Sequence, residues 1–127
     1  MQHILFVHDF QESPLPRKNY LEMSGFQVTL LRNGTECLKL LAREKPALVL
    51  MDVLLEGKNG FEVCRAIRER CTSAELPIIL CSHIYRSRIY RDEAAAAGAQ
   101  RYLLLPIKLD ELLAHVTELA AGAAQKR

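Results

Sequence analysis

The segment 47–63, ALVLMDVLLEGKNGFEV, decides the fold of this chain. It begins with an apolar run that leads directly into Asp52, and a turn at 57–60 then leads into a helical pattern. A short apolar run without alternation is typical of a strand buried on both faces, as in a parallel sheet covered by helices. Asp52 would then lie at the carboxyl end of a central strand, where open α/β sheets bind ligands. The alternative from this segment alone is an acidic residue that merely ends a strand.

The composition favours one compact domain outside the membrane. The chain has 127 residues, half of them apolar, and its 17 basic and 15 acidic side chains leave a formal charge of +2. This balance is too even to indicate nucleic acid, a membrane surface or an acidic partner. No apolar run approaches the roughly 20 residues of a membrane span, and no leader pattern opens the sequence. We therefore expect a cytoplasmic protein with a domain at residues 1–121 and a short tail at 122–127.

The cysteines do not form a metal or disulfide pattern. They are Cys37, Cys64, Cys71 and Cys81. None of them has a CxxC partner, so we expect reduced and mostly buried thiols that act as small apolar residues.

The rest of the chain repeats the strand and helix alternation. Strands are expected at 4–7, 26–31, 47–51, 78–81 and 102–105, and helices at 16–24, 35–44, 61–70, 90–97 and 109–120. This alternation implies βαβ units and a doubly wound, five-stranded parallel sheet with helices on both faces. Right-handed crossovers favour the flavodoxin-like strand order 2-1-3-4-5, a three-layer sandwich. That order brings the ends of the first, third, fourth and fifth strands to one crevice.

Polar side chains follow three of those strand ends. The residues expected in the crevice are His8, Asp9, Asp52, Ser82, His83 and Leu105. Two carboxylates in one crevice need a shared proton or cation, and Mg²⁺ is typically bound by one or two carboxylates. A carboxylate beside such a metal can act as a nucleophile and form an aspartyl phosphate. Ser82 could then donate a hydrogen bond to a phosphoryl oxygen.

Over nearly its whole length the chain resembles the receiver domain of two-component response regulators, the CheY-like family. The pieces that carry the resemblance are 4–10 (ILFVHDF), 50–52 (LMD) with Gly60 beyond it, 77–82 (PIILCS), and 98–99 (GA) followed by 102–106 (YLLLP).

The resemblance implies roles for individual residues. Asp52 would accept a phosphoryl group from a histidine kinase or phosphotransfer protein, and Asp9, Asp52 and the Leu54 carbonyl would bind the metal. Ser82 would hold the phosphoryl group, and Tyr102 would be the aromatic switch. The family also has a cis peptide bond before the proline that ends the fifth strand, so we expect one at Leu105-Pro106.

Four positions depart from the family pattern. The family usually has an acid where His8 stands, lysine at Leu105, proline at Glu56 and a small residue at His83. The lysine normally pairs with the phosphoryl group, and a charge-assisted bond of that kind contributes roughly 1.5–3 kcal/mol. His8, His83, Arg86 and Arg88 are candidates to replace that cation. The structural alternative for His8 and His83 is that they only line the crevice as hydrogen-bonded polar residues.

These departures leave several functions open. Our first interpretation is a signalling module with at most self-phosphorylation and autodephosphorylation at Asp52, and weak Mg²⁺ binding. The alternative is a pseudo-receiver that signals through protein contacts without phosphorylation. Zn²⁺ or another divalent ion, bound by His8, Asp9, Asp52 and His83, is a further possibility because imidazole suits zinc. A small metal-dependent hydrolase or a flavin-binding protein would also fit the same fold.

The segment 85–91 interleaves arginines with tyrosines and an isoleucine. A nucleic-acid surface is conceivable, but three arginines in a nearly neutral domain make a thin basic footprint. The family resemblance points instead to an output protein or domain, or a homodimer, that binds the fourth helix, fifth strand and fifth helix.

Overall fold

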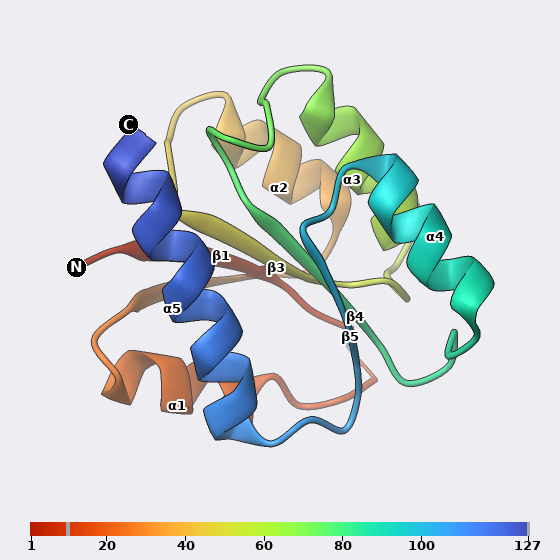
Figure 1. Cartoon of the computed structure of the whole chain (residues 1–127), viewed down its shortest axis with the longest axis horizontal. Helices are drawn as coiled ribbons and strands as arrows, with labels where there is room; N and C mark the ends of the chain where they lie inside the picture. Colours follow the sequence, from red (N-terminus) through yellow and green to blue (C-terminus); the bar gives the residue numbers. More distant parts are fainter. Residues whose placement is uncertain (10, 127) are drawn as a thin grey trace.

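The computed structural model describes residues 1–9 and 11–126, with side chains described as far as residue 122. The strands are β1 His3–Val7, β2 Gln27–Leu31, β3 Leu48–Asp52, β4 Ile78–Ser82 and β5 Arg101–Leu104. All neighbouring pairs are parallel, and the order is β2-β1-β3-β4-β5 (Figure 1). The predicted fold class and strand order are therefore confirmed.

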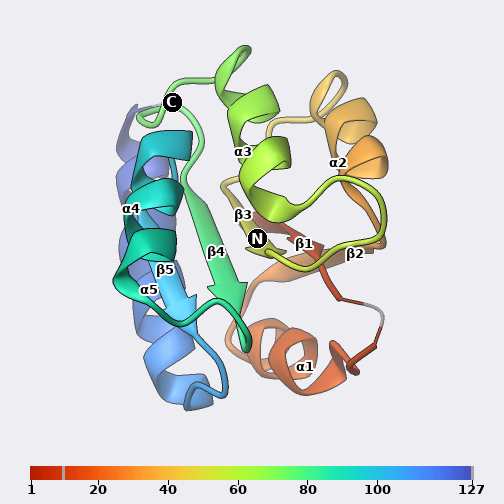
Figure 2. The same ribbon diagram turned by 90° about the vertical axis from the view of Figure 1, so that its right-hand side faces the viewer.

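Helices cover both faces of the sheet. They are α1 Leu15–Met23, α2 Gly34–Leu41, α3 Gly60–Arg68, α4 Arg88–Ala97 and α5 Leu109–Lys126. Buried residues of α1 and α5 share one core cluster, and those of α2, α3 and α4 share the other, so the domain has three layers (Figure 2).

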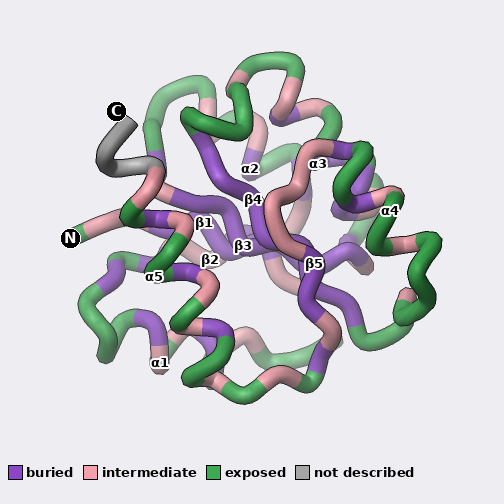
Figure 3. Tube along the Cα trace, viewed as in Figure 1, coloured by how far each residue is buried: buried purple, intermediate pink, exposed green. Residues whose placement is uncertain are grey.

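The central strands are buried along their whole length, as an apolar run without alternation predicts. Every residue of β3 and β4 is buried, whereas the outward faces of the helices are exposed (Figure 3). Burial of this apolar surface is the main source of stability in such a sandwich. The core also positions Asp52, because every residue of the strand that carries it is buried.

The turn after β3 depends on close backbone packing. A Cβ atom at Gly60 would lie 2.8 Å from the Asp52 carbonyl oxygen and from the Val53 Cα. The Gly60 amide donates to the Val53 carbonyl at 2.7 Å, and α3 then begins with a capping box between Asn59 and Glu62. Glycine at this position lets α3 start directly against the end of β3.

Two local predictions have different outcomes. The Leu105-Pro106 peptide bond is cis, as expected. The last helix was expected to end at Ala120, and this is wrong: α5 continues to Lys126 through most of the expected tail. The alanines around Gly122 favour helix strongly enough to offset the glycine.

The cysteines agree with the prediction of reduced thiols. All of them are free, with Cys71 partly buried and the others buried. Burial raises the pKa of Cys37 to about 12, so this thiol stays protonated at neutral pH. In the part of the chain that the structure describes, no helix is both long enough and apolar enough to cross a membrane.

Candidate functional site

A small cavity lies at the carboxyl ends of the strands. Its volume is about 20 Å³, which is room for roughly one water molecule. It is lined by Asp9, Glu12, Asp52, Leu54, Cys81, Ser82, His83, Ile84 and Leu105. The structure thus brings together the residues expected at this edge, except that His8 is not among those lining the cavity.

Asp52 is the most deeply placed acid of the site. It ends β3, and only 4% of its surface is exposed. The backbone amide of Asp9 donates to Asp52 Oδ2 at 2.7 Å, so the end of β1 holds the carboxylate in place. A buried carboxylate at this edge needs a positive partner as well.

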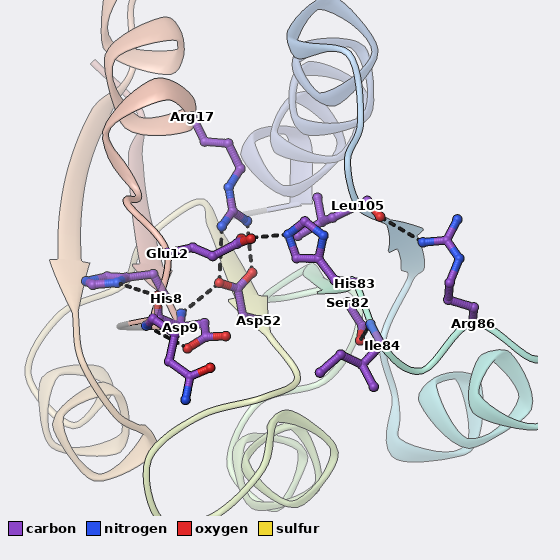
Figure 4. Close-up of polar contacts among 11 residues, drawn as sticks. His8, Asp9, Glu12, Arg17, Asp52, Ser82, His83, Ile84, Arg86 and Leu105 are labelled. Atoms are coloured by element: carbon purple, nitrogen blue, oxygen red, sulfur yellow. Dashed lines mark hydrogen bonds and ion pairs between the residues drawn. The ribbon is translucent and has the colours of Figure 1, made fainter.

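That partner is Arg17, which reaches the site from α1 (Figure 4). Its Nη1 donates to Asp52 Oδ1 at 2.8 Å and its Nη2 to Oδ2 at 3.1 Å, a two-pronged ion pair. Arg17 is 8% exposed, and its guanidinium carbon lies 4.5 Å from the centre of the Phe6 ring. Burial by itself lowers the pKa of Arg17, but the hydrogen bond and charge of Asp52 outweigh burial and raise it. Arg17 is therefore permanently charged.

Sequence reasoning did not identify Arg17. It proposed Arg86 or Arg88 as replacements for the lysine. Arg86 instead donates to the backbone carbonyl of Leu105 at 2.7 Å, and Arg88 is an exposed residue at the start of α4. In the described residues of the unmodified chain, the cation paired with Asp52 is Arg17. A signal was present, because Arg17 lies one helical turn before the apolar Leu21 and shares its face.

His8 and Asp9 stand side by side at the end of β1. His8 Nδ1 lies 3.4 Å from the Asp9 carbonyl oxygen, and its ring packs edge-on against Phe6 at 5.9 Å between ring centres. Asp9 Oδ1 accepts a hydrogen bond from the Gln11 amide at 2.9 Å. In the described residues, His8 therefore lies against Phe6 and the Asp9 carbonyl, beside the cavity rather than in its lining.

Glu12 adds an acid that sequence reasoning also missed. Its Oε2 lies 2.6 Å from His83 Nε2, so the loop after β1 is joined to the loop after β4 across the cavity. Both side chains are exposed. This pairing accounts for His83, which lines the cavity as a hydrogen-bonded polar residue rather than as the counter-charge of Asp52.

Ser82 shapes the loop after β4. Its hydroxyl oxygen accepts hydrogen bonds from the amides of Ile84 at 3.1 Å and Tyr85 at 3.0 Å, and 5% of the residue is exposed. These two bonds use the acceptor capacity of the hydroxyl and leave its proton as a donor, which is within hydrogen-bond reach of the Tyr102 hydroxyl. Ser82 is thus placed where a ligand in the cavity would meet it.

Tyr102 contacts the same loop from β5. Its hydroxyl donates to the Tyr85 carbonyl, and burial raises the pKa of Tyr102. Its ring stacks on Phe61 at 6.2 Å, and Tyr85 packs against Tyr90 at 4.7 Å. The tyrosines of segment 85–91 therefore belong to an aromatic cluster with Phe61 and Tyr102, which does not favour their use as a nucleic-acid stacking surface.

The oxygen atoms of the cavity suit a hard divalent cation. Asp9, Asp52 and Leu54 line the cavity, and carboxylates and backbone carbonyls are donor types that Mg²⁺ prefers. Among the described residues, no group of three or more His, Cys, Asp or Glu side chains converges as a metal would require. The arrangement thus fits a cation held by few protein ligands and completed by water. Because Arg17 engages both Asp52 oxygens, a metal at Asp52 would either share an oxygen with the guanidinium or displace one of its bonds.

Comparison with known proteins agrees with this geometry. A family model described as the response regulator receiver domain matches residues 4–117. The chain is 34% identical over 116 residues to the response regulator MprA of Mycobacterium leprae, covering 91% of this chain and 50% of that protein. It is 37% identical over 116 residues to the uncharacterized transcriptional regulatory protein YkoG of Bacillus subtilis, covering 90% and 49%. The chain therefore spans about half the length of these curated relatives.

Solved structures give the same result. The BeF3-activated receiver domain of RstA from Klebsiella pneumoniae is 30% identical with a TM-score of 0.84, covering 94% of this chain and 98% of that one. The receiver domain of sensor histidine kinase PA1611 from Pseudomonas aeruginosa, which has magnesium coordinated in its active site cleft, is 27% identical with a TM-score of 0.83 and the same coverage. This chain belongs to the response regulator receiver domain family of two-component signalling proteins.

Proposed function

We propose that Asp52 is the phosphoacceptor of this receiver domain. The observation that carries the proposal is the position of its carboxylate, which is buried at the end of β3 and faces a cavity shared with Asp9, Leu54 and Ser82. An Asp52 oxygen would attack the phosphorus of a phosphohistidine, the P–N bond would break, and the imidazole of the donor would leave with the bonding electrons. The chain is then a signalling module rather than an enzyme with a turnover of its own.

Mg²⁺ is the cofactor that we propose for this step. Asp9, Asp52 and the Leu54 carbonyl would hold it, and when bound it supplies positive charge to the phosphoryl oxygens. We expect weak binding, because Arg17 already neutralises Asp52. The Ser82 hydroxyl would donate a hydrogen bond to a phosphoryl oxygen.

The response would pass through the loop after β4. If Ser82 turns toward the phosphoryl group, its bonds to the amides of Ile84 and Tyr85 change, and Tyr102 is bonded to that same loop. This links the cavity to the face of α4, β5 and α5, where a groove of about 640 Å³ runs between α4 and α5. We propose that this face binds the output domain, a partner protein or a second copy.

We further propose a histidine kinase or phosphotransfer protein as the donor and the cytoplasm as the location. The four free thiols support this location, because reduced cysteines are the rule in that compartment. The matched relatives are about twice as long as this chain, so their output activity belongs to regions outside the match.

Intact mass after incubation with acetyl phosphate tests the function. We expect one added phosphoryl group that requires both Mg²⁺ and Asp52, and no addition to the Asp52→Asn variant, whose amide keeps the size of the side chain but is not a nucleophile. If the wild-type chain gains no mass under conditions that modify an ordinary receiver, the function fails, and the chain is a pseudo-receiver that acts through protein contacts.

A further inference from the structure

The charge that balances this site comes from an unexpected element. Receiver domains usually carry a lysine where this chain has Leu105, and the structure places the Arg17 guanidinium on Asp52 from α1 instead. Arg17 and Leu105 line the same groove, of about 310 Å³, between α1 and the segment after β5. Leu105 is apolar and therefore does not compete with Arg17 for an anion at this side of the site.

We propose that Arg17 is an exchangeable counter-charge. In the unmodified protein it neutralises Asp52 and competes with Mg²⁺ for the carboxylate, and after phosphoryl transfer it pairs with the phosphoryl oxygens. This inference rests on the proposed function, because it assigns a residue to the same reaction.

The competition follows from the hydrogen bonds of Asp52. Each carboxylate oxygen accepts from Arg17, and Oδ2 also accepts from the Asp9 amide. Arg17 cancels one of the two negative charges that Asp9 and Asp52 would offer to a divalent cation. A metal that coordinates Asp52 must therefore either displace an Arg17 bond or share a carboxylate oxygen with the guanidinium and meet its repulsion.

The second partner follows from guanidinium chemistry. The planar fork of arginine matches phosphate oxygens as well as it matches a carboxylate. Esterification removes the charge of Asp52 and adds negative oxygens beside it, so the ion pair with the carboxylate is lost and a new anion stands within reach. Contact with the Phe6 ring keeps the guanidinium at this edge in both states.

Substitution of Arg17 tests the proposal through two binding measurements on the whole chain. We compare Arg17→Met with Lys18→Met, a matched control that removes a positive charge from the same helix, where Lys18 is paired with Glu22. Calorimetry measures Mg²⁺ affinity. Fluorine NMR at saturating Mg²⁺ measures binding of beryllofluoride, a phosphoryl mimic.

The proposal predicts opposite changes. Arg17→Met binds Mg²⁺ about tenfold more tightly, because a charge-assisted competitor is gone, and beryllofluoride about tenfold more weakly, because its counter-charge is gone. Lys18→Met changes neither by more than about twofold, as expected for an exposed pair. A purely structural role for Arg17 would weaken both, and either that result or no change in both overturns the proposal.

A double variant guards against a folding defect. Arg17→Met/Leu105→Lys restores a cation at the usual family position, and we expect beryllofluoride affinity within about threefold of wild type. Failure of this variant to recover binding while it remains folded overturns the proposal. The wild-type chain separates the two hypotheses. If it takes neither a phosphoryl group nor beryllofluoride, the proposed function fails. If wild type and Arg17→Met are phosphorylated and bind beryllofluoride equally well, only the role of Arg17 is overturned.

Discussion

Two arginines hold opposite ends of the sheet, and they do so with different partners. Arg17 lies at the carboxyl end and faces the carboxylate of Asp52. Arg68 lies near the amino ends of β4 and β5 and donates to neutral oxygens: the Gly98 carbonyl at 2.9 Å, the Leu76 carbonyl at 2.7 Å and the Gln100 side chain at 3.0 Å. Arg68 therefore ties together backbone segments that follow α3 and α4.

Burial lowers the pKa of both guanidinium groups, but the net shifts of their pKa values have opposite signs. Burial lowers the pKa of Arg68, since no carboxylate compensates it, whereas Asp52 raises the pKa of Arg17 above its ordinary value. Arg68 donates to backbone carbonyls of the folded chain, so its hydrogen bonds stabilise the fold. A cation paired with a reactive carboxylate can exchange that partner for another anion, and this is the physical difference between a structural arginine and a functional one.

The largest expected effect is the cost of breaking the Arg17–Asp52 pair. Arg17→Met and Asp52→Asn should each lower the free energy of unfolding by about 3 kcal/mol, because each leaves a buried partner uncompensated. The double variant should cost at least about 2 kcal/mol less than the two single costs together. Urea denaturation without Mg²⁺ measures all four proteins. If the losses in the free energy of unfolding add, Arg17 and Asp52 are not coupled, and the contrast drawn with Arg68 fails.

Arg68→Met should have a somewhat smaller effect, of about 2–3 kcal/mol, because several carbonyl groups lose a charged donor in a region that is only partly buried. Its Mg²⁺ affinity should equal that of wild type, in contrast to Arg17→Met. The matched control is Arg65→Met on the same helix, where an exposed pair with Glu93 at 3.6 Å should contribute about 0.5 kcal/mol or less. A change in Mg²⁺ affinity on loss of Arg68 would show that the two ends of the sheet are coupled.

The sequence predicted the site residues that lie at the ends of strands. Asp9, Asp52 and Ser82 meet because parallel strands place their carboxyl ends at one edge, and strand order follows from the alternation of elements. The same logic placed Leu105 there, and the family resemblance then indicated that a lysine usual at this position is absent. The buried runs around Asp52 are long enough for this reasoning to be secure.

The sequence did not predict the residues that reach the site from outside the strands. Arg17 and Glu12 belong to α1 and the loop before it, and the direction of their side chains depends on how α1 docks on the sheet. Arg86 was an equally good candidate by sequence, because it follows Ser82 closely, but its bond to the Leu105 carbonyl takes it away from Asp52. Which of the two arginines pairs with Asp52 depends on tertiary packing and cannot be predicted from local sequence patterns.

The smallest expected effect is on the pH dependence of stability. It concerns two buried cysteines, one near each end of the sheet. Cys81 pairs in register with Asp52, and burial together with that negative charge raises its pKa to about 12. Cys64 lies near Arg68; burial raises its pKa to about 11, against the lowering influence of Arg68 and Arg65. Because unfolding returns each thiol to its ordinary pKa near 9, the unfolded state binds fewer protons above that pH, and stability falls as pH rises.

Cys81→Ala and Cys64→Ala should each reduce this alkaline loss by up to about 1.4 kcal/mol per pH unit. Urea denaturation at several pH values between 8 and 10.5 measures the slope of the free energy of unfolding against pH. The packing cost of each substitution is the same at every pH, so it does not change this slope. Both slopes should be reduced, because in the folded protein the pKa of each thiol is raised to the upper end of this range or beyond it. An unchanged slope in either variant would mean that burial does not raise the pKa of that thiol.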